Sequence, residues 1–146
     1  TYVKVKGQWW YSYRAVDKEG NNVDFLLTKR RQCISAQRFL IKAIENNGNP
    51  DLINIDKSGT NTQAIILYNQ RSYSKINIRQ FEYLNNIVEQ DHRMMKWRIM
   101  QGIGFKEFES AKIAIAGIEI VHMLKKNQLI NPGNSTLESF KSLASC

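Results

Sequence analysis

The sequence has few of the residues that mark secreted or zinc-binding proteins. Its 146 residues contain two cysteines, Cys33 and Cys146, and two histidines. The cysteines have neither CxxC spacing nor enough partners for a disulfide framework, and no cluster of Cys and His suggests zinc. The longest apolar stretch, residues 113–124, carries Glu119 and His122 and is too short to span a bilayer. No charged and then apolar leader opens the chain, so we expect a soluble, cytoplasmic protein with two free thiols.

Acidic residues are also scarce. Thirteen Asp and Glu stand against 21 Lys and Arg, which gives a net charge of +8 and a pI near 9.6. This excess favours a polyanionic partner, with nucleic acid ahead of an anionic membrane surface. At 42% hydrophobic residues, the chain is long enough for one domain with a real core and too short to suggest two. We therefore predict a single domain over residues 1–146.

The first part of the chain predicts an antiparallel meander of three strands. The strands are expected at residues 2–6, 9–16 and 23–27, with turns at Gly7-Gln8 and at residues 18–21. In the middle strand, odd-numbered aromatic residues lie on one face and Trp10 and Val16 on the other, so we expect both faces to be covered. The odd-numbered residues are Trp9, Tyr11 and Tyr13. A base-stacking platform is the alternative interpretation of these aromatics.

The second part of the chain alternates helices with strands. Apolar residues at helical spacing predict a helix over residues 36–44, followed by a short strand at 52–55 that ends on Asp56. A helix at 60–70, a weaker strand at 73–78 and a helix at 81–98 come next. A further helix is expected at 108–122. In the last segment, Ser135 and Glu138 form a capping box ahead of a short helix. That helix is expected to dock through an apolar face made of Leu137, Phe140 and Ala144.

The predicted helix at 81–98 has two different faces. Its apolar stripe consists of Phe81, Leu84, Ile87, Val88 and Met95, and its polar face of Asn85, Glu89, His92, Arg93 and Lys96. A carboxylate with cations four and seven residues later suits a group that holds a metal while its neighbours hold phosphates. From periodicity alone, a solvated face with ordinary ion pairs explains the same pattern.

The run YLNNIVEQDHRMMK at residues 83–96 resembles the catalytic-glutamate helix of DDE transposases of the IS-six insertion-sequence group, relatives of retroviral integrases. The resemblance continues through TYVKVKGQWWYSYRAVDKEGN at the start, NIDKSG at 54–59 and FESAKIAIAGIE at 108–119, and it thins after about Gln128. It implies an α/β, RNase H-like fold with a five-stranded mixed sheet flanked by helices. The predicted order of elements agrees with this fold.

The resemblance also identifies candidate catalytic and metal-binding residues. It implies Asp56 as the second catalytic aspartate and Glu89 as the catalytic glutamate. Asp91 competes, because 32 residues separate Asp56 from Glu89 and 34 separate it from Asp91, and the family's usual spacing is about thirty-four. However, two helical positions are a rotation of about 200°, which places Asp91 in the apolar stripe. We therefore choose Glu89, and expect Asp91 to be a buried partner of a group such as an arginine.

The activity implied by the resemblance is that of a DNA transposase. Clustered carboxylates suit Mg²⁺ or Mn²⁺, and two such ions would support cleavage of transposon-end DNA and its transfer into target DNA. Candidate DNA-binding residues are Lys57, His92, Arg93 and Lys96. We expect His122 to be a packing residue only. The active complex is expected to be a homodimer without membrane contact, in a bacterial cytoplasm and associated with the nucleoid.

One departure from the family's pattern affects the expected activity. The family's first catalytic aspartate stands in an Asp-Glu pair directly before the Thr-Tyr that here is Thr1-Tyr2, so it falls two residues upstream of this chain. Asp17 and Asp24 are poor substitutes. The family's N-terminal helix-turn-helix is missing too. Two alternatives therefore stay open: a decayed copy that only binds nucleic acid, and a nuclease of the same fold that cuts without joining.

Overall fold

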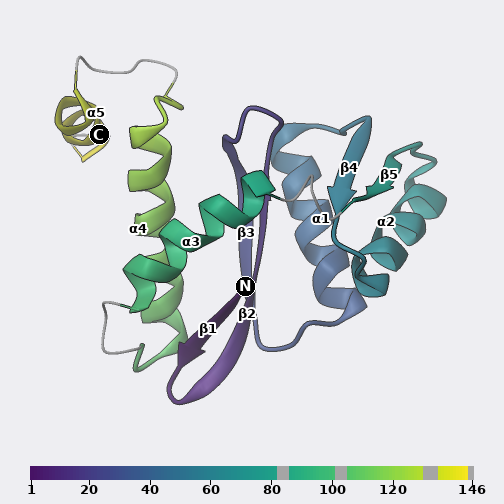
Figure 1. The fold of residues 1–146 in the computed structure, drawn as a ribbon, viewed down its shortest axis with the longest axis horizontal. Coiled ribbons are helices and arrows are strands. Elements are labelled where there is room, and N and C mark those ends of the chain that lie inside the picture. Colours follow the sequence, from purple (N-terminus) through teal and green to yellow (C-terminus); the bar gives the residue numbers. More distant parts are fainter. Residues whose placement is uncertain (82–85, 101–104, 130–134, 145–146) are drawn as a thin grey trace.

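The computed structural model describes residues 1–81, 86–100, 105–129 and 135–144. Five strands and five helices are assigned within these ranges, and Figure 1 shows their arrangement. The strands are β1 (Tyr2–Val5), β2 (Gln8–Val16), β3 (Asn22–Thr28), β4 (Leu52–Ile55) and β5 (Asn77–Gln80). The helices are α1 (Cys33–Asn47), α2 (Gly59–Ser72), α3 (Asn86–Met100), α4 (Phe108–Lys125) and α5 (Thr136–Ala144).

The predicted meander is confirmed. β1 pairs antiparallel with β2, and β2 pairs antiparallel with β3. The first turn lies one residue earlier than predicted, at Lys6 and Gly7, which both have positive φ angles of the kind that tight hairpins use. The second turn is held by Asp17, whose Oδ1 accepts hydrogen bonds from the amides of Glu19 and Asn21.

Helices cover both faces of the meander, as the aromatic pattern predicted. On the face that carries Trp10, the buried side chains of Val3, Val5 and Leu27 pack against Ala111 and Ile115 of α4. On the opposite face, Tyr13 stacks on Phe39 of α1 with ring centroids 5.6 Å apart. Core packing is therefore the role of Tyr13. Trp9 is the exception, because its ring is exposed beneath the ammonium of Lys4.

β4, α2 and β5 form a parallel strand–helix–strand unit. β4 and β5 pair in register from Leu52 opposite Asn77 to Ile55 opposite Gln80. The strand predicted at 73–78 is displaced towards the C-terminus, and the reason is local. Tyr73 caps α2 in a left-handed conformation, and the side chain of Asn69 both donates to the carbonyl of Ile76 and accepts from its amide. These contacts form a turn that delays the strand to Asn77.

The α/β class is confirmed, but the expectation of one five-stranded sheet needs correction. Among the described residues, β1, β2 and β3 form one sheet, and β4 and β5 form a second. The ladder between β1 and β2 starts where Thr1 exchanges backbone hydrogen bonds with Ser12. The segment of β2 beyond Ser12 therefore has no strand partner on the β1 side in the described part of the chain. This segment faces β4 across a cavity.

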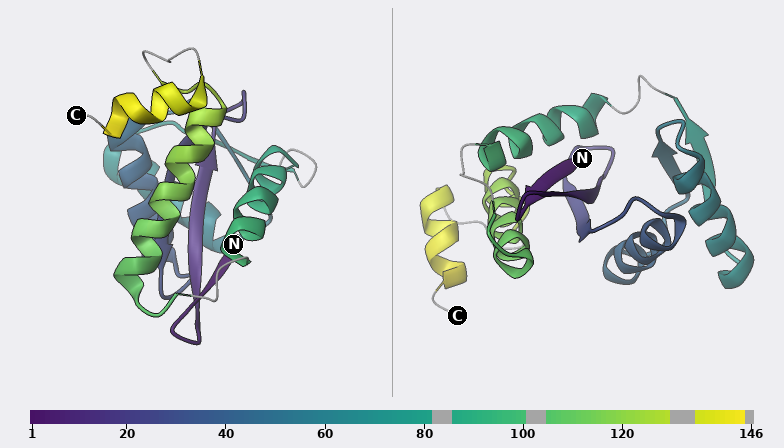
Figure 2. Two further views of the ribbon diagram at one scale, coloured as in Figure 1. Left: turned by 90° about the vertical axis from the view of Figure 1, so that its left-hand side faces the viewer. Right: turned by 90° about the horizontal axis from the view of Figure 1, so that it is seen from below.

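The helix predicted at 81–98 is displaced in the structure. α3 runs from Asn86 to Met100, and Phe81 lies outside it. Leu84 and Asn85 belong to the segment 82–85, which is outside the described residues, as are the side chains of Ile87 and Met95. In Figures 1 and 2, α3 crosses the strands of the meander, and α4 packs beside it. α4 matches its prediction, and Phe105, three residues before it begins, is bridged to Val5 of β1.

The cap by Ser135 on the last helix is confirmed, but the docking face of that helix is not. The amide of Glu138 donates to Oγ of Ser135 over 3.2 Å. Leu137 and Phe140 are exposed, while Ser139 is buried. The side chain of Ala144 lies outside the described residues. Leu137 and Phe140 were expected to face inward because they are apolar, but it is Ser139 that α5 buries.

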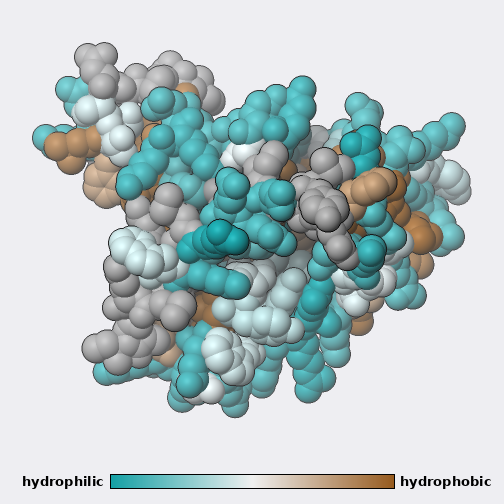
Figure 3. Space-filling model, in the orientation of Figure 1, coloured by the Kyte–Doolittle hydropathy of each residue, from teal (hydrophilic) through white to brown (hydrophobic). Residues whose placement is uncertain are grey.

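No helix in the described part of the chain is long and apolar enough to cross a membrane. The face of the molecule in Figure 3 is mostly hydrophilic. Hydrophobic side chains gather at its two ends, over α5 and over the unit of β5 and α2. The middle of this face, where α3 crosses the strands, is polar.

Candidate metal and DNA site

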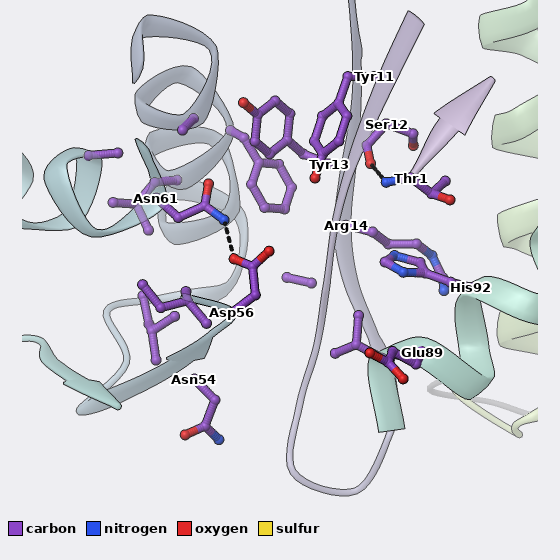
Figure 4. Close-up of a pocket in the computed structure, with 18 of the residues that line it drawn as sticks. Thr1, Tyr11, Ser12, Tyr13, Arg14, Asn54, Asp56, Asn61, Glu89 and His92 are labelled. Carbon is purple, nitrogen blue, oxygen red and sulfur yellow. Dashed lines mark hydrogen bonds between the residues drawn. The ribbon is translucent and has the colours of Figure 1, made fainter. Parts of the chain in front are cut away.

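The cavity between β2 and β4 has a volume of about 360 Å³ and gathers the candidate residues. It is lined by Asp56 at the end of β4 and by Glu89, His92 and Lys96 on α3. Figure 4 shows Asp56 on one side of the cavity and Glu89 and His92 on the other, with β2 between them. The fold therefore brings together four of the six residues that the sequence identified.

Asp56 is placed by the way its strand ends. The chain leaves β4 at this residue, and the amide of Ser58 turns back to donate to its carbonyl over 2.7 Å before α2 begins at Gly59. The carboxylate is about half exposed and has two partners. Nη2 of Arg31 donates to Oδ2 over 3.2 Å, and Nδ2 of Asn61 in the first turn of α2 donates to Oδ1 over 3.3 Å.

Arg31 follows β3 in the basic run Lys29-Arg30-Arg31, and its position beside Asp56 was not predicted from the sequence. Its guanidinium lies 5.0 Å from the centroid of the Tyr11 ring, within the range of a cation–π contact. Tyr11 itself makes edge-on contacts with Tyr2 and Tyr13. The side chain therefore lies between an aromatic ring of β2 and the carboxylate at the end of β4.

Glu89 lies in the first turn of α3, and the polar face of this helix meets the cavity. His92 is half-buried, and Glu89 and Lys96 are exposed. Arg93 on the same helix and Lys57 beside Asp56 are also exposed, but neither lines the cavity. The side chain of Asp91 is outside the described residues, so its expected burial beside an arginine stays a prediction. That Asp56 and Glu89 share a metal ion also stays a prediction.

The electrostatics of the cavity are seen in the amino group of Thr1. Burial, together with the positive charges of Lys96 and Arg31, lowers the pKa of this group from 8.0 to about 5, and the carboxylate of Asp56 acts in the opposite direction. On the same side, burial raises the pKa of Tyr13 to about 12 and raises that of Tyr11. The cavity is thus partly withdrawn from water near Thr1, Tyr11 and Tyr13.

Comparison with known proteins identifies the family. A family model described as a DDE domain matches residues 1–128. The chain belongs to the DDE-domain family of transposases. It is 35% identical over 130 residues to the transposase for insertion sequence-like element IS431mec of Staphylococcus aureus. It is also 35% identical over 130 residues to the transposase for insertion sequence element IS257 in transposon Tn4003 of that species. Each match covers 88% of this chain and 57% of the relative, so the chain spans little more than half of their length.

Solved structures confirm the fold of this DDE domain. It resembles the HTLV-2 integrase catalytic core domain in complex with magnesium, with a TM-score of 0.61 and 18% identity. That match covers 94% of this chain and 89% of the other. A chain in the structure of the simian T-cell lymphotropic virus intasome in complex with PP2A regulatory subunit B56 gamma gives the same TM-score and identity over 82% of this chain and 44% of that one. The RNase H-like α/β fold, inferred from the resemblance to integrases, is therefore confirmed.

A second polar cluster of this DDE domain lies between β2 and α4 and was not foreseen. Arg14 donates from Nε and Nη2 to the two carboxylate oxygens of Glu119 over 2.6 and 2.8 Å. Asn22 donates to the same carboxylate over 2.7 Å and accepts from Arg14 and Lys126. Nδ1 of His122 lies 3.4 Å from Nη2 of Arg14, so this histidine is buried as expected but not purely apolar in its contacts.

The signal for this cluster was present in the sequence. Glu119 interrupts an apolar run, and a carboxylate at a buried helix position requires a charged partner. The sequence analysis used this residue only to exclude a membrane span. Asp17 and Asp24 are engaged elsewhere, in the turn before β3 and in a 2.6 Å ion pair with Lys42. These contacts agree with the view that they are poor substitutes for a catalytic aspartate.

Proposed function

We propose that this chain is the catalytic core of a DNA transposase that cleaves phosphodiester bonds at transposon ends and joins the ends to target DNA. The observation that carries the proposal is that Asp56 and Glu89, chosen by their motifs, line one cavity although they lie on β4 and α3. Lys96 lines the same cavity and supplies a positive charge for a phosphate. Family membership supports the reaction class.

The residues at the cavity fit a divalent cation of the magnesium type. Asp56 and Glu89 offer carboxylate oxygens, which Mg²⁺ and Mn²⁺ prefer. No cluster of three or more His, Cys, Asp or Glu with metal-binding geometry occurs among the described residues, so two carboxylates are what this chain supplies there. When bound, a pair of such ions would lower the barrier to in-line displacement at phosphorus.

The other residues would bind and orient the DNA. Lys96 and Arg93, on the exposed side of α3, hold DNA phosphates beside the carboxylates. His92, on the same helix, donates a hydrogen bond to the DNA backbone. Lys57 reaches a phosphate from the β4 side.

We propose that the first catalytic aspartate stands two residues upstream of Thr1. Thr1 lines the cavity and continues the β1 ladder by its hydrogen bonds with Ser12. In an antiparallel ladder, residues preceding Thr1 would run along Tyr13 and Arg14 of β2, which line the same cavity opposite β4. An aspartate there would be directed between Asp56 and Glu89.

A DNA-nicking assay tests the proposal. The chain extended by the Asp-Glu pair should nick supercoiled DNA in the presence of Mg²⁺, whereas the chain as given should be at least about a hundredfold slower because a metal-binding carboxylate is missing. In the extended chain, Asp56→Asn and Glu89→Gln should remove activity. Glu109→Gln, a change at an exposed carboxylate of α4, is the matched control. Equal rates for the given and extended chains would refute the assignment of the missing aspartate.

Two outcomes separate the alternative functions. A chain that binds DNA but remains inert when extended is a decayed copy with a binding role. A chain that nicks DNA but never joins a 3′-hydroxyl end to a second duplex is a nuclease of the same fold. Gel analysis of labelled 3′ ends incubated with a target plasmid distinguishes joining from cutting.

The assembly and cellular setting are further parts of the proposal. We propose that residues 1–146 form one domain and act as a homodimer on paired transposon ends, in the nucleoid of a bacterial cytoplasm. The bacterial transposases among the relatives support the setting. Sedimentation of the extended chain with and without transposon-end DNA tests the dimer, which should appear with two DNA ends bound.

A further inference from the structure

The contacts of Arg31 place a positive charge beside Asp56, the candidate metal ligand. Its guanidinium donates a hydrogen bond to Oδ2 of Asp56 and lies against the ring of Tyr11. It comes from the exposed basic segment between β3 and α1, whereas Tyr11 belongs to β2 and Asp56 directly follows β4. A guanidinium has five N–H donors, so the single bond to Asp56 leaves donors for another anion.

The pair between Arg31 and Asp56 is weak enough to exchange. The two side chains are 32% and 53% exposed, and exposed pairs change an equilibrium by less than about fivefold. A divalent ion at Asp56 carries twice the charge of the guanidinium and would displace it. The contact with Tyr11 does not depend on Asp56 and would keep the displaced guanidinium beside the cavity.

We propose that Arg31 is an exchangeable counter-ion of Asp56, which neutralises the carboxylate before metal binds and passes to a DNA phosphate when metal takes its place. This inference rests on the proposed function, because it assumes that Asp56 is a metal ligand and that DNA lies at the cavity. It assigns Arg31 a positioning role that couples metal binding to DNA binding. Arg30 precedes it in the same segment, has no contact with Asp56, and serves as the matched control.

The coupling can be measured without metal, by a double-mutant cycle on DNA affinity in EDTA. Asp56→Asn should tighten binding of a short duplex, because it removes a negative charge and releases Arg31. The gain should be about two- to fivefold larger with Arg31 present than in the Arg31→Gln background. In the Arg30→Gln background, the gain should equal that of the unchanged chain. A gain that is equal or larger with Arg31→Gln refutes the proposal.

A second measurement follows Mn²⁺ binding to the chain extended by the Asp-Glu pair, by electron paramagnetic resonance in the absence of DNA. Arg31→Gln removes the competing cation and should tighten Mn²⁺ binding about two- to fivefold more than Arg30→Gln, which reports the general loss of one charge. If Asp56→Asn abolishes binding but the two arginine variants behave alike, this inference alone fails. If Mn²⁺ binding is absent or survives Asp56→Asn, the metal site of the proposed function fails, and the inference fails with it.

Discussion

Two arginine–carboxylate pairs of the same chemistry differ in their surroundings. Arg14 and Glu119 are 2% and 5% exposed, with distances of 2.6 and 2.8 Å and a further bond from Asn22. Arg31 and Asp56 are 32% and 53% exposed and share one bond of 3.2 Å. The first pair is closed on all sides and joins β2 to α4. The second opens on a cavity.

The difference shows that burial decides whether an ion pair is fixed in place or can separate. A buried pair that loses one member leaves the other without water or a partner, so the pair is fixed in place. An exposed pair loses little when it separates, because water replaces each partner. We therefore expect the closed pair to support the fold and the open pair to support function, and each can be tested by substitution.

The largest expected effect is on stability when the closed pair is broken. Glu119→Gln leaves the guanidinium of Arg14 buried without a counter-charge and should lower the free energy of unfolding by about 3–5 kcal/mol. Asp56→Asn should lower it by less than about 1 kcal/mol. Urea titrations followed by tryptophan fluorescence measure both. Similar losses in the two variants would show that burial does not separate the pairs.

The next largest effect is expected on DNA binding, and only for substitutions at the cavity beside the open pair. Lys96→Ala should weaken binding to all sequences alike and lower the slope of log affinity against log salt by about one, since one phosphate contact is lost. Lys125→Ala, on the exposed end of α4, should leave the slope unchanged. The unfolding midpoints of both variants should match that of the unchanged chain. Binding that ignores salt would count against the whole electrostatic argument.

A chain that begins at Thr1 should also show a pH dependence, because its free amino group lies at the cavity. The pKa of the Thr1 amine is about 5 in the folded chain and near 8.0 when unfolded, so the folded state binds fewer protons between these values. The stability from this group is therefore complete above about pH 8 and is lost as pH falls towards 5. Urea midpoints measured across this range should decline more steeply than those of the N-acetylated chain. Parallel curves would show that the amine is solvated.

The smallest effect is on the stability of the open pair itself. Arg31→Gln should lower the free energy of unfolding by less than about 1 kcal/mol, because both partners remain accessible to water. The same urea titration detects it. A loss as large as that of Glu119→Gln would place Arg31 among the structural residues and remove the contrast between the pairs.

Local patterns in the sequence predicted most of the elements. The meander, α1, β4, α2 and α4 follow from alternation, helical spacing and turn residues, which act over a few positions. β5 was displaced because a side chain of the preceding helix, Asn69, binds the backbone at Ile76. The separation of the strands into two sheets depends on which strand lies beside β4, and no local pattern carries that information.

The candidate site was predicted from motifs and not from periodicity. Asp56 alone looked like a turn residue, and the polar face around Glu89 had an equally good explanation as a solvated surface. The partners of the charges could not be predicted, since Arg31 meets Asp56, and Arg14 meets Glu119, through tertiary contacts. Only for Glu119 did the sequence offer a signal, because a carboxylate within an apolar helix is expected to be buried and to need a charged partner.

The closed pair has a consequence for folding kinetics. Arg14 and Glu119 are 105 positions apart in the chain, whereas the hairpins of the meander join neighbouring segments. Closing so long a loop is entropically costly, so this contact should form after the rate-limiting step. In a chevron analysis, Glu119→Gln should then speed unfolding and leave the folding rate nearly unchanged. The ion pair would slow unfolding and so lengthen the lifetime of the folded protein.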